Sequence, residues 1–287
     1  MQHRPCTFLV IAISVLLMAC SNAPTTSDSN QSIIDARNSF KSSDFKAALR
    51  NLDKAIKLAP DDAARQQAVA LRTVLVTALA DANKQMAEAY AAGARQPAAQ
   101  SHPGPFYNMR SDYYNNAKSY LMDGMQSVMN QRAKMSGNPI PMEVSFPGFT
   151  GTNPGLTKIK SGQFVSDSER LSAEAQADRN ALAVVLSAVG GAGQDPVKGQ
   201  ELFSSGKVDV DPRVYIIELS NSFLQTGAIF EFRGLNEPDR LRTVNEVVDG
   251  NLAVAQKLLD AKPDKDMEAR VKKMQCDCDK VLKKKIA

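Results

Sequence analysis

The segment ARNSFKSSDFKAALRNLDKAIKLAPDD, residues 36–62, decides the fold class. Asp44 begins a run in which apolar residues return every three or four positions, the period of a helix with one buried face. These residues are Phe45, Ala48, Leu49, Leu52, Ala55 and Ile56. Pro60 ends the run, and Asp62 is well placed to cap a following helix. A shorter helical pattern precedes it at Ile33, Ile34, Arg37 and Phe40.

The same segment resembles a tetratricopeptide repeat. The positions that carry the resemblance are Ala36, Phe40, Asp44, Phe45, Ala48, Leu52, Ala55 and Pro60. Ser39 and Leu52 depart from the large rings usual at their positions, and only one good copy of the motif is present. The resemblance covers 27 of the 268 residues that follow Ala19. It implies helical hairpins that present a concave face to a peptide.

Helical spacing continues through most of the chain on the C-terminal side. The capping box at Ser166 and Glu169 opens one helix, and proline at a first turn opens others. We expect helices over 63–92, 106–135 and 166–189, with further starts at Asp195, Asp211, Asn236 and after Pro263. The fold class predicted is all-α, built from helical hairpins.

Residues 136–165 interrupt this pattern with four prolines and five glycines. Irregular insertions of this length are uncommon and usually functional or mobile. Short runs at 142–146 and 156–159 leave room for a small β-hairpin. The large apolar residues of this insertion are candidate binding residues: Phe146, Phe149, Ile159 and Phe164. Those that do not pack on the helices would form an exposed binding surface. The flanking halves, 32–135 and 166–287, form one domain or two subdomains.

The N-terminus carries Arg4 and then the apolar run FLVIAISVLLM at 8–18. Eleven residues are too few to cross a bilayer, which needs about 20, but they suit a signal peptide. The run ends in Leu17-Met18-Ala19-Cys20, which resembles the lipobox of bacterial lipoproteins. The alternative is an ordinary secretory peptide in which Cys20 falls by chance.

The lipobox resemblance implies where the protein is held. Residues 1–19 are removed as a signal peptide, and Cys20 receives fatty acyl chains such as palmitate; two or three chains anchor a protein stably. Residues 20–31 then form a polar tether, and 32–287 the helical domain. The expected location is the cell envelope, and Ser21 favours the outer membrane where a cell has two.

The mature chain keeps 34 basic and 31 acidic residues, and the excess lies in 262–287, net +4. Such a tail either lies against anionic lipid head groups or complements a helix dipole, and we favour the second role. Nucleic acid is not an expected partner, because no pattern interleaves aromatic and basic residues. We expect contact with the membrane through the lipid anchor, and an envelope protein as partner.

Few residues suggest catalysis or metal binding. His102 is the one histidine after Cys20, and it lies in a proline-rich connector. On a helix Cys276 and Cys278 point about 200° apart, so we expect a surface thiol and a core thiol; a disulfide or a soft-metal site is the alternative. Glu231, Glu237 and Asp239, which flank Arg233, could serve a glycosidase, but helix capping is their more ordinary role.

The sequence therefore predicts a non-catalytic lipoprotein without cofactor or metal. It would bind a protein partner or a small ligand. The alternatives are a hydrolase that acts on the cell wall and a lipoprotein that handles thiols or metal.

Overall fold

The computed structural model describes residues 26–231 and 237–283. In that part the fold is all-α with one small two-stranded sheet, as predicted. The buried side chains form one continuous cluster that extends from Ile33 to Cys278. The halves before and after the insertion therefore share a core. No helix among the described residues is long and apolar enough to span a membrane.

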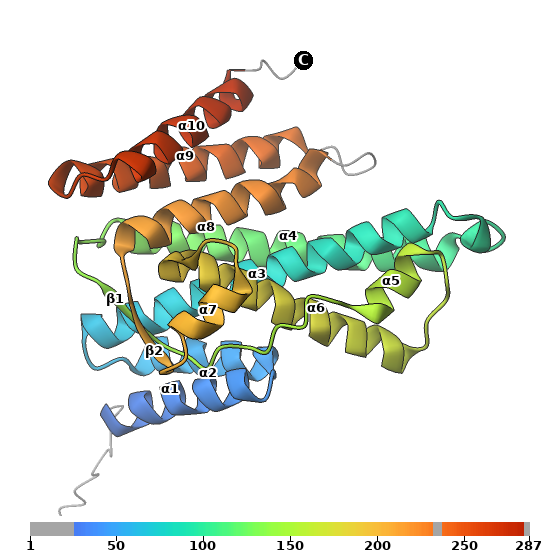
Figure 1. Cartoon of the computed structure of the whole chain (residues 1–287), viewed down its shortest axis with the longest axis horizontal. Helices are drawn as coiled ribbons and strands as arrows, with labels where there is room; N and C mark the ends of the chain where they lie inside the picture. The colour runs from blue at the N-terminus through green and yellow to red at the C-terminus, as the bar shows by residue number, and fades with distance from the viewer. Residues whose placement is uncertain (1–25, 232–236, 284–287) are drawn as a thin grey trace, which may run out of the picture.

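The centre of the molecule is a pair of long helices, α3 (Asp62–Gly93) and α4 (Gly104–Arg132), joined by a connector that holds the short helix η1 (Pro97–Ala99). Every residue from Thr73 to Ala80 is buried, so this part of α3 is enclosed on all sides. Alanine is frequent in α3, and its small side chain lets neighbouring helices approach closely. As a result α2, α4, α6 and α8 all pack against α3 (Figure 1).

The N-terminal hairpin consists of α1 (Thr26–Lys41) and α2 (Phe45–Leu58). Asp44 caps α2 by accepting a hydrogen bond from Ala47 N at 2.9 Å. The first helix begins six residues before the expected boundary at residue 32, so 26–31 belong to the helix and not to the tether. Gln31 Nε2 donates to Asp35 Oδ1 at 2.8 Å, a contact one turn apart that supports this early start.

The cap of α3 also differs from the expectation. Asp61, and not Asp62, accepts the hydrogen bond from Ala64 N, at 2.8 Å. Asp62 is the first helical residue, where its negative charge complements the helix dipole.

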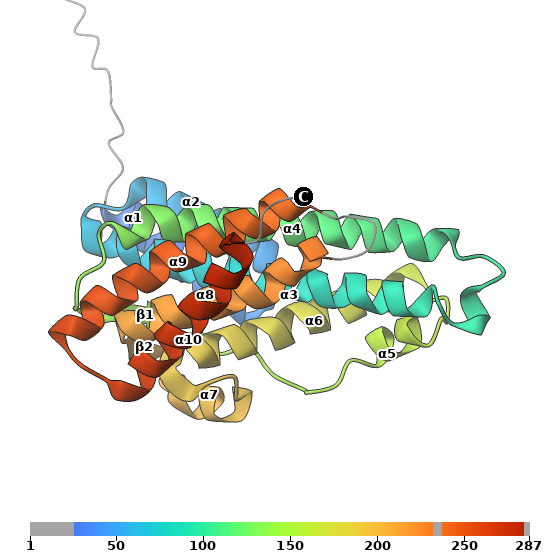
Figure 2. The same ribbon diagram turned by 90° about the horizontal axis from the view of Figure 1, so that it is seen from above.

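The C-terminal part of the chain covers the central pair from two sides. On one side α6 (Asp167–Ser187) lies along α3. It continues into a short π-helix, η2 (Ala188–Ala192), which is followed by α7 (Pro196–Leu202). On the other side α8 (Pro212–Gly227) ends in η3 (Ala228–Glu231), and α9 (Pro238–Ala261) and α10 (Lys265–Leu282) stack outward from it (Figures 1 and 2).

The small sheet joins two segments that are distant in sequence. β1 (Ile140–Glu143) pairs antiparallel with β2 (Lys207–Val210), with Ile140 opposite Val210. The expected sheet is present, but its second strand comes from outside the insertion. The other alternating run, 156–159, lies in α5 (Pro154–Lys160), where Asn153 accepts from Leu156 N at 3.0 Å and Pro154 opens the helix. A run of four residues is too short to distinguish the two periods.

Candidate functional site

A groove of about 320 Å³ opens at the start of α2, between α3, α4 and α6. We name it the Asp178 groove. Polar and charged residues supply most of its wall: Ser43, Asp44, Lys46, Asn83, Asn116, Tyr120, Glu174 and Asp178. Apolar atoms come from Phe45, Leu79, Leu171 and Ala175. Its volume is at the lower end of the range found for small-molecule sites.

The sequence of α6 explains why two carboxyl groups stand beside the core. Ala173, Ala177 and Ala181 are buried at four-residue spacing, so one face of α6 approaches its neighbours closely. Glu174 and Asp178 each follow one of these alanines and lie one turn apart. They are therefore held at the edge of the packed face, where both line the groove.

Asp178 has no polar partner in the described part of the chain: no hydrogen bond or ion pair reaches its carboxyl group. The side chain is half-buried, and it lines the groove. Burial and, to a smaller extent, the negative charge of Glu174 together raise the pKa of Asp178 to about 7, although Lys46 opposes the shift. Near neutral pH the carboxyl group therefore gains and loses its proton readily.

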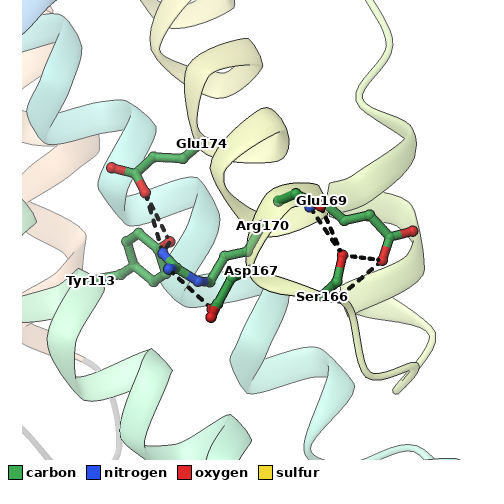
Figure 3. Close-up of polar contacts among 7 residues, drawn as sticks. Tyr113, Ser166, Asp167, Glu169, Arg170 and Glu174 are labelled. Atoms are coloured by element: carbon green, nitrogen blue, oxygen red, sulfur yellow. Dashed lines mark hydrogen bonds and ion pairs between the residues drawn. The ribbon is translucent and has the colours of Figure 1, made fainter.

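Glu174, one turn away, is held by a network instead (Figure 3). Tyr113 Oη donates to Glu174 Oε2 at 3.2 Å, and Arg170 Nη1 lies 3.7 Å from the same oxygen. Arg170 also donates to Tyr113 Oη at 3.5 Å and to Asp167 Oδ1 at 3.3 Å. Burial raises the pKa of Tyr113, so its hydroxyl group stays a donor.

This network lies at the N-terminus of α6, which is stabilised by a cap. Next to it Ser166 and Glu169 form the predicted capping box (Figure 3). Lys158 Nζ of α5 contacts Glu169 Oε1 at 2.7 Å. Glu174 is thus fixed to the wall of the groove, whereas Asp178 is not.

The other walls offer mainly acceptor atoms. Asn83 donates its amide to Leu79 O at 2.8 Å, which leaves its carbonyl oxygen as an acceptor. Asp44 is partly used as the cap of α2. Burial and the charges of Asp178 and Glu174 raise the pKa of Tyr120. Three carboxyl groups against the single cation Lys46 make the groove negative when Asp178 is ionised.

The four candidate residues of the insertion contact different parts of the molecule. Phe146 is half-buried and its ring lies 5.9 Å from that of Phe203, while Ile159 is fully buried. Phe149 and Phe164 are exposed, at 36% and 56%, and Phe164 packs edge-on against Phe106 at 5.1 Å. Two of the four therefore serve packing, and no single apolar surface unites them.

Of the acidic residues considered for a hydrolase, Glu237 and Asp239 lie at the start of α9 and Glu231 lies at the end of η3. Glu237 is engaged by Lys118 Nζ at 2.7 Å and by Arg240. Glu231 and Asp239 are exposed, and Arg233 lies outside the described residues. Charge pairing lowers the pKa of Glu237, so this residue is unsuited to act as a general acid near neutral pH.

The two cysteines of α10 point to opposite environments, as the helical spacing predicts. Cys278 is fully buried, and burial raises the pKa of its thiol to about 11. Cys276 is exposed. No group of three or more His, Cys, Asp or Glu side chains within the described ranges could hold a metal ion. His102 is exposed, and Cys20 lies outside the described residues.

Sequence reasoning missed the groove, although part of its signal was visible. Asn83 interrupts an apolar stripe of α3, and a polar residue in a buried stripe indicates a polar contact. Glu174 and Asp178 are four residues apart within an alanine-rich helix, which places two like charges side by side. Local sequence patterns do not predict that α2, α4 and α6 pack together around these residues. Comparison of the chain with protein-family models, with curated proteins and with solved structures gives no match.

Proposed function

We propose that the protein is a lipid-anchored, non-catalytic lipoprotein of the cell envelope that holds a small organic cation in the Asp178 groove. The observation that carries the proposal is the Asp178 carboxyl group, which faces a groove of suitable volume without a polar partner among the described residues. A carboxyl group that is partly withdrawn from water gains stability from an ion pair or a hydrogen bond. A bound ligand would supply the missing partner.

The chemistry of the wall favours a protonated amine. Asp178 and the free oxygen of Asn83 accept hydrogen bonds, and an ammonium group has three donors and no acceptor. Phe45, Leu79 and Leu171 offer apolar contact for the rest of such a molecule. The positive charge of Lys46, which also lines the groove, would repel a bound cation.

The lipobox at 17–20 supports the anchor. An envelope protein as partner, which the tetratricopeptide resemblance implies, stays a prediction. The insertion that we expected to bind such a partner has its apolar side chains divided between packing and solvent.

The raised pKa of Asp178 favours one second function. A carboxyl group that is half-protonated near neutral pH, with Glu174 one turn away, is also what acid catalysis in a glycosidase requires. This hydrolase would release soluble sugars from cell-wall polysaccharide, and Asp178→Asn would stop the release. A ligand-binding protein releases none.

The binding test is calorimetry at pH 8 with small primary amines of increasing apolar size and with the matching alcohols. We expect amines to bind and alcohols not to bind. Asp178→Asn should weaken amine binding at least tenfold, since a charge-assisted hydrogen bond contributes about 1.5–3 kcal/mol. Lys46→Gln should strengthen it, because a repelling charge is removed.

The matched control for this test is Asp260→Asn, which removes one carboxyl group from the exposed surface of α9. It should change amine affinity less than twofold. Equal effects of the two Asp→Asn changes, or the absence of binding by every amine, would contradict the proposed function.

The anchor is tested separately in bacteria that make the full chain. Labelled palmitate should enter the wild-type protein and the Cys6→Ser variant, because Cys6 is removed with the signal peptide. Cys20→Ser should abolish the label and move the protein out of the membrane fraction. Label that persists in Cys20→Ser would exclude the anchor.

A further inference from the structure

The exposed face of α2 carries a stripe of positive charge, made of Lys46, Arg50, Lys54 and Lys57. At about 100° per residue these four positions fall within an arc of about 80°. The buried residues Phe45, Ala48, Leu52 and Ala55 occupy the opposite side of the helix. We name the four basic residues, Lys46, Arg50, Lys54 and Lys57, the α2 basic stripe.

None of the four cations has an ion pair or a side-chain hydrogen bond within residues 26–231 and 237–283. The one acidic residue of α2, Asp53, is engaged by Arg72 Nε at 2.6 Å, and Arg72 also contacts Asp123 at 2.9 Å. Asp53 therefore does not neutralise the stripe. Like charges one turn apart on a helix face repel each other, and an anionic surface outside the protein would relieve this repulsion.

The stripe lies close to the point where the chain would be anchored. Only residues 21–25 separate Cys20 from the first residue of α1, Thr26. Six residue steps span at most about 20 Å when fully extended. Lipid on Cys20 would therefore hold the start of α1 within about 20 Å of the bilayer surface. This step rests on the proposed anchor, whereas the charge argument does not.

The hairpin geometry brings the two regions together. A turn of three residues, 42–44, joins α1 to α2, so the helices run antiparallel. Lys54 and Lys57, in the last turns of α2, therefore lie beside the first turns of α1. The hairpin forms one outer side of the molecule, and α10 forms the opposite side (Figure 1).

We infer that the α2 basic stripe docks on the anionic head groups of the membrane that holds the lipid anchor. Juxtamembrane basic residues are attracted to such a surface, by about fivefold in affinity for each Lys or Arg near it. Docking lays the α1–α2 hairpin on the bilayer and turns α10 towards the aqueous side. Because Lys46 lies in both the stripe and the Asp178 groove, the groove opens beside the membrane surface.

The test measures vesicle binding by the chain from residue 20 onward with Cys20→Ser, so that no acyl chain contributes. The vesicles contain phosphatidylcholine alone or mixed equally with phosphatidylglycerol, at low salt. The test variant is Arg50→Gln with Lys54→Gln and Lys57→Gln; Lys46 stays because it lines the groove. The matched control removes three exposed cations of α10, Lys265, Lys272 and Lys273, by the same change to Gln.

We expect binding to the anionic vesicles only, and loss of that binding in 0.5 M salt, because screening then shortens the electrostatic range to a few ångströms. The stripe variant should bind at least tenfold more weakly, and the α10 variant less than threefold. The charge-conserving variant Lys54→Arg with Lys57→Arg should bind like the parent chain, which shows that charge and not packing is measured.

Two results would overturn the inference. In one, the stripe variant binds as well as the parent chain; in the other, the α10 variant loses as much binding as the stripe variant, so that net charge alone decides. Since the protein in this experiment carries no lipid, failure of the stripe is distinguishable from failure of the anchor at Cys20.

Discussion

Charged side chains next to the core are paired on one side of the central α3–α4 pair, and one is unpaired on the other side. On the side of α8, Arg213 is buried and donates to Asp211 Oδ1 at 3.0 Å and to Lys262 O at 2.6 Å. Glu218 is buried, and its Oε1 accepts a hydrogen bond from Arg270 Nη2 of α10 at 2.6 Å. On the side of α6, Asp178 faces a groove without a partner in the described chain. Paired charges join elements, whereas an unpaired one lowers stability and is available to a ligand.

Replacing Arg213 tests the paired side and should have the largest effect. Arg213→Leu leaves Asp211 half-buried without its cation, and it removes the hydrogen bond to the Lys262 carbonyl group that connects α8 to the end of α9. We expect the free energy of unfolding to fall by about 3–5 kcal/mol, as when one partner of a buried pair is lost. Urea denaturation measures the change.

The control for Arg213 is Arg242→Leu, which breaks an exposed pair with Glu246 within α9. Exposed pairs of this kind contribute less than about 1 kcal/mol. Losses of similar size in the two variants would show that burial does not distinguish these pairs.

Replacing Asp178 tests the unpaired side and should change stability in the opposite direction. The pKa of Asp178 is about 7 in the folded protein and near 3.8 in the unfolded chain. The folded state therefore binds more protons between these values, and wild-type stability falls as the pH rises from about 4 to about 7. Asp178→Asn removes this loss and should stabilise the protein at pH 8 by roughly 2–4 kcal/mol.

At pH 4 the same substitution should change stability little, because the wild-type carboxyl group is then protonated in the folded state. Thermal unfolding of both proteins at pH 4 and pH 8 measures the difference. A gain of equal size at both pH values would mean that the substitution acts through packing and not through the charge of Asp178.

The helices and the groove differ in how far the sequence predicts them. Helix starts rest on local chemistry, so the capping box at Ser166 and the prolines at 196, 212 and 238 indicated their helices correctly. The start of α1 was placed too late, because polar residues at 26–31 resemble a tether as much as a first turn. The strand that pairs with β1 and the walls of the groove depend on contacts between segments distant in sequence. The local hydrophobic period does not predict such contacts.

The smallest effect is expected at the two cysteines of α10. Cys276→Ser should change the free energy of unfolding by less than about 0.5 kcal/mol, because the side chain is exposed and away from special features. In the native wild type a thiol reagent should label Cys276 quickly and Cys278 only on unfolding, since Cys278 is buried with a pKa of about 11. Equal labelling rates would show that α10 does not hold Cys278 in the core.

The most direct measurement of the central claim is a carbon NMR titration of the Asp178 carboxyl group, assigned by its loss in Asp178→Asn. Without ligand we expect a pKa near 7, and with a bound amine we expect a lower value, because an adjacent cation favours the ionised form. A pKa near 4 in the free protein would mean that the carboxyl group is already solvated or paired. The Asp178 groove would then have no unsatisfied charge for a ligand to meet.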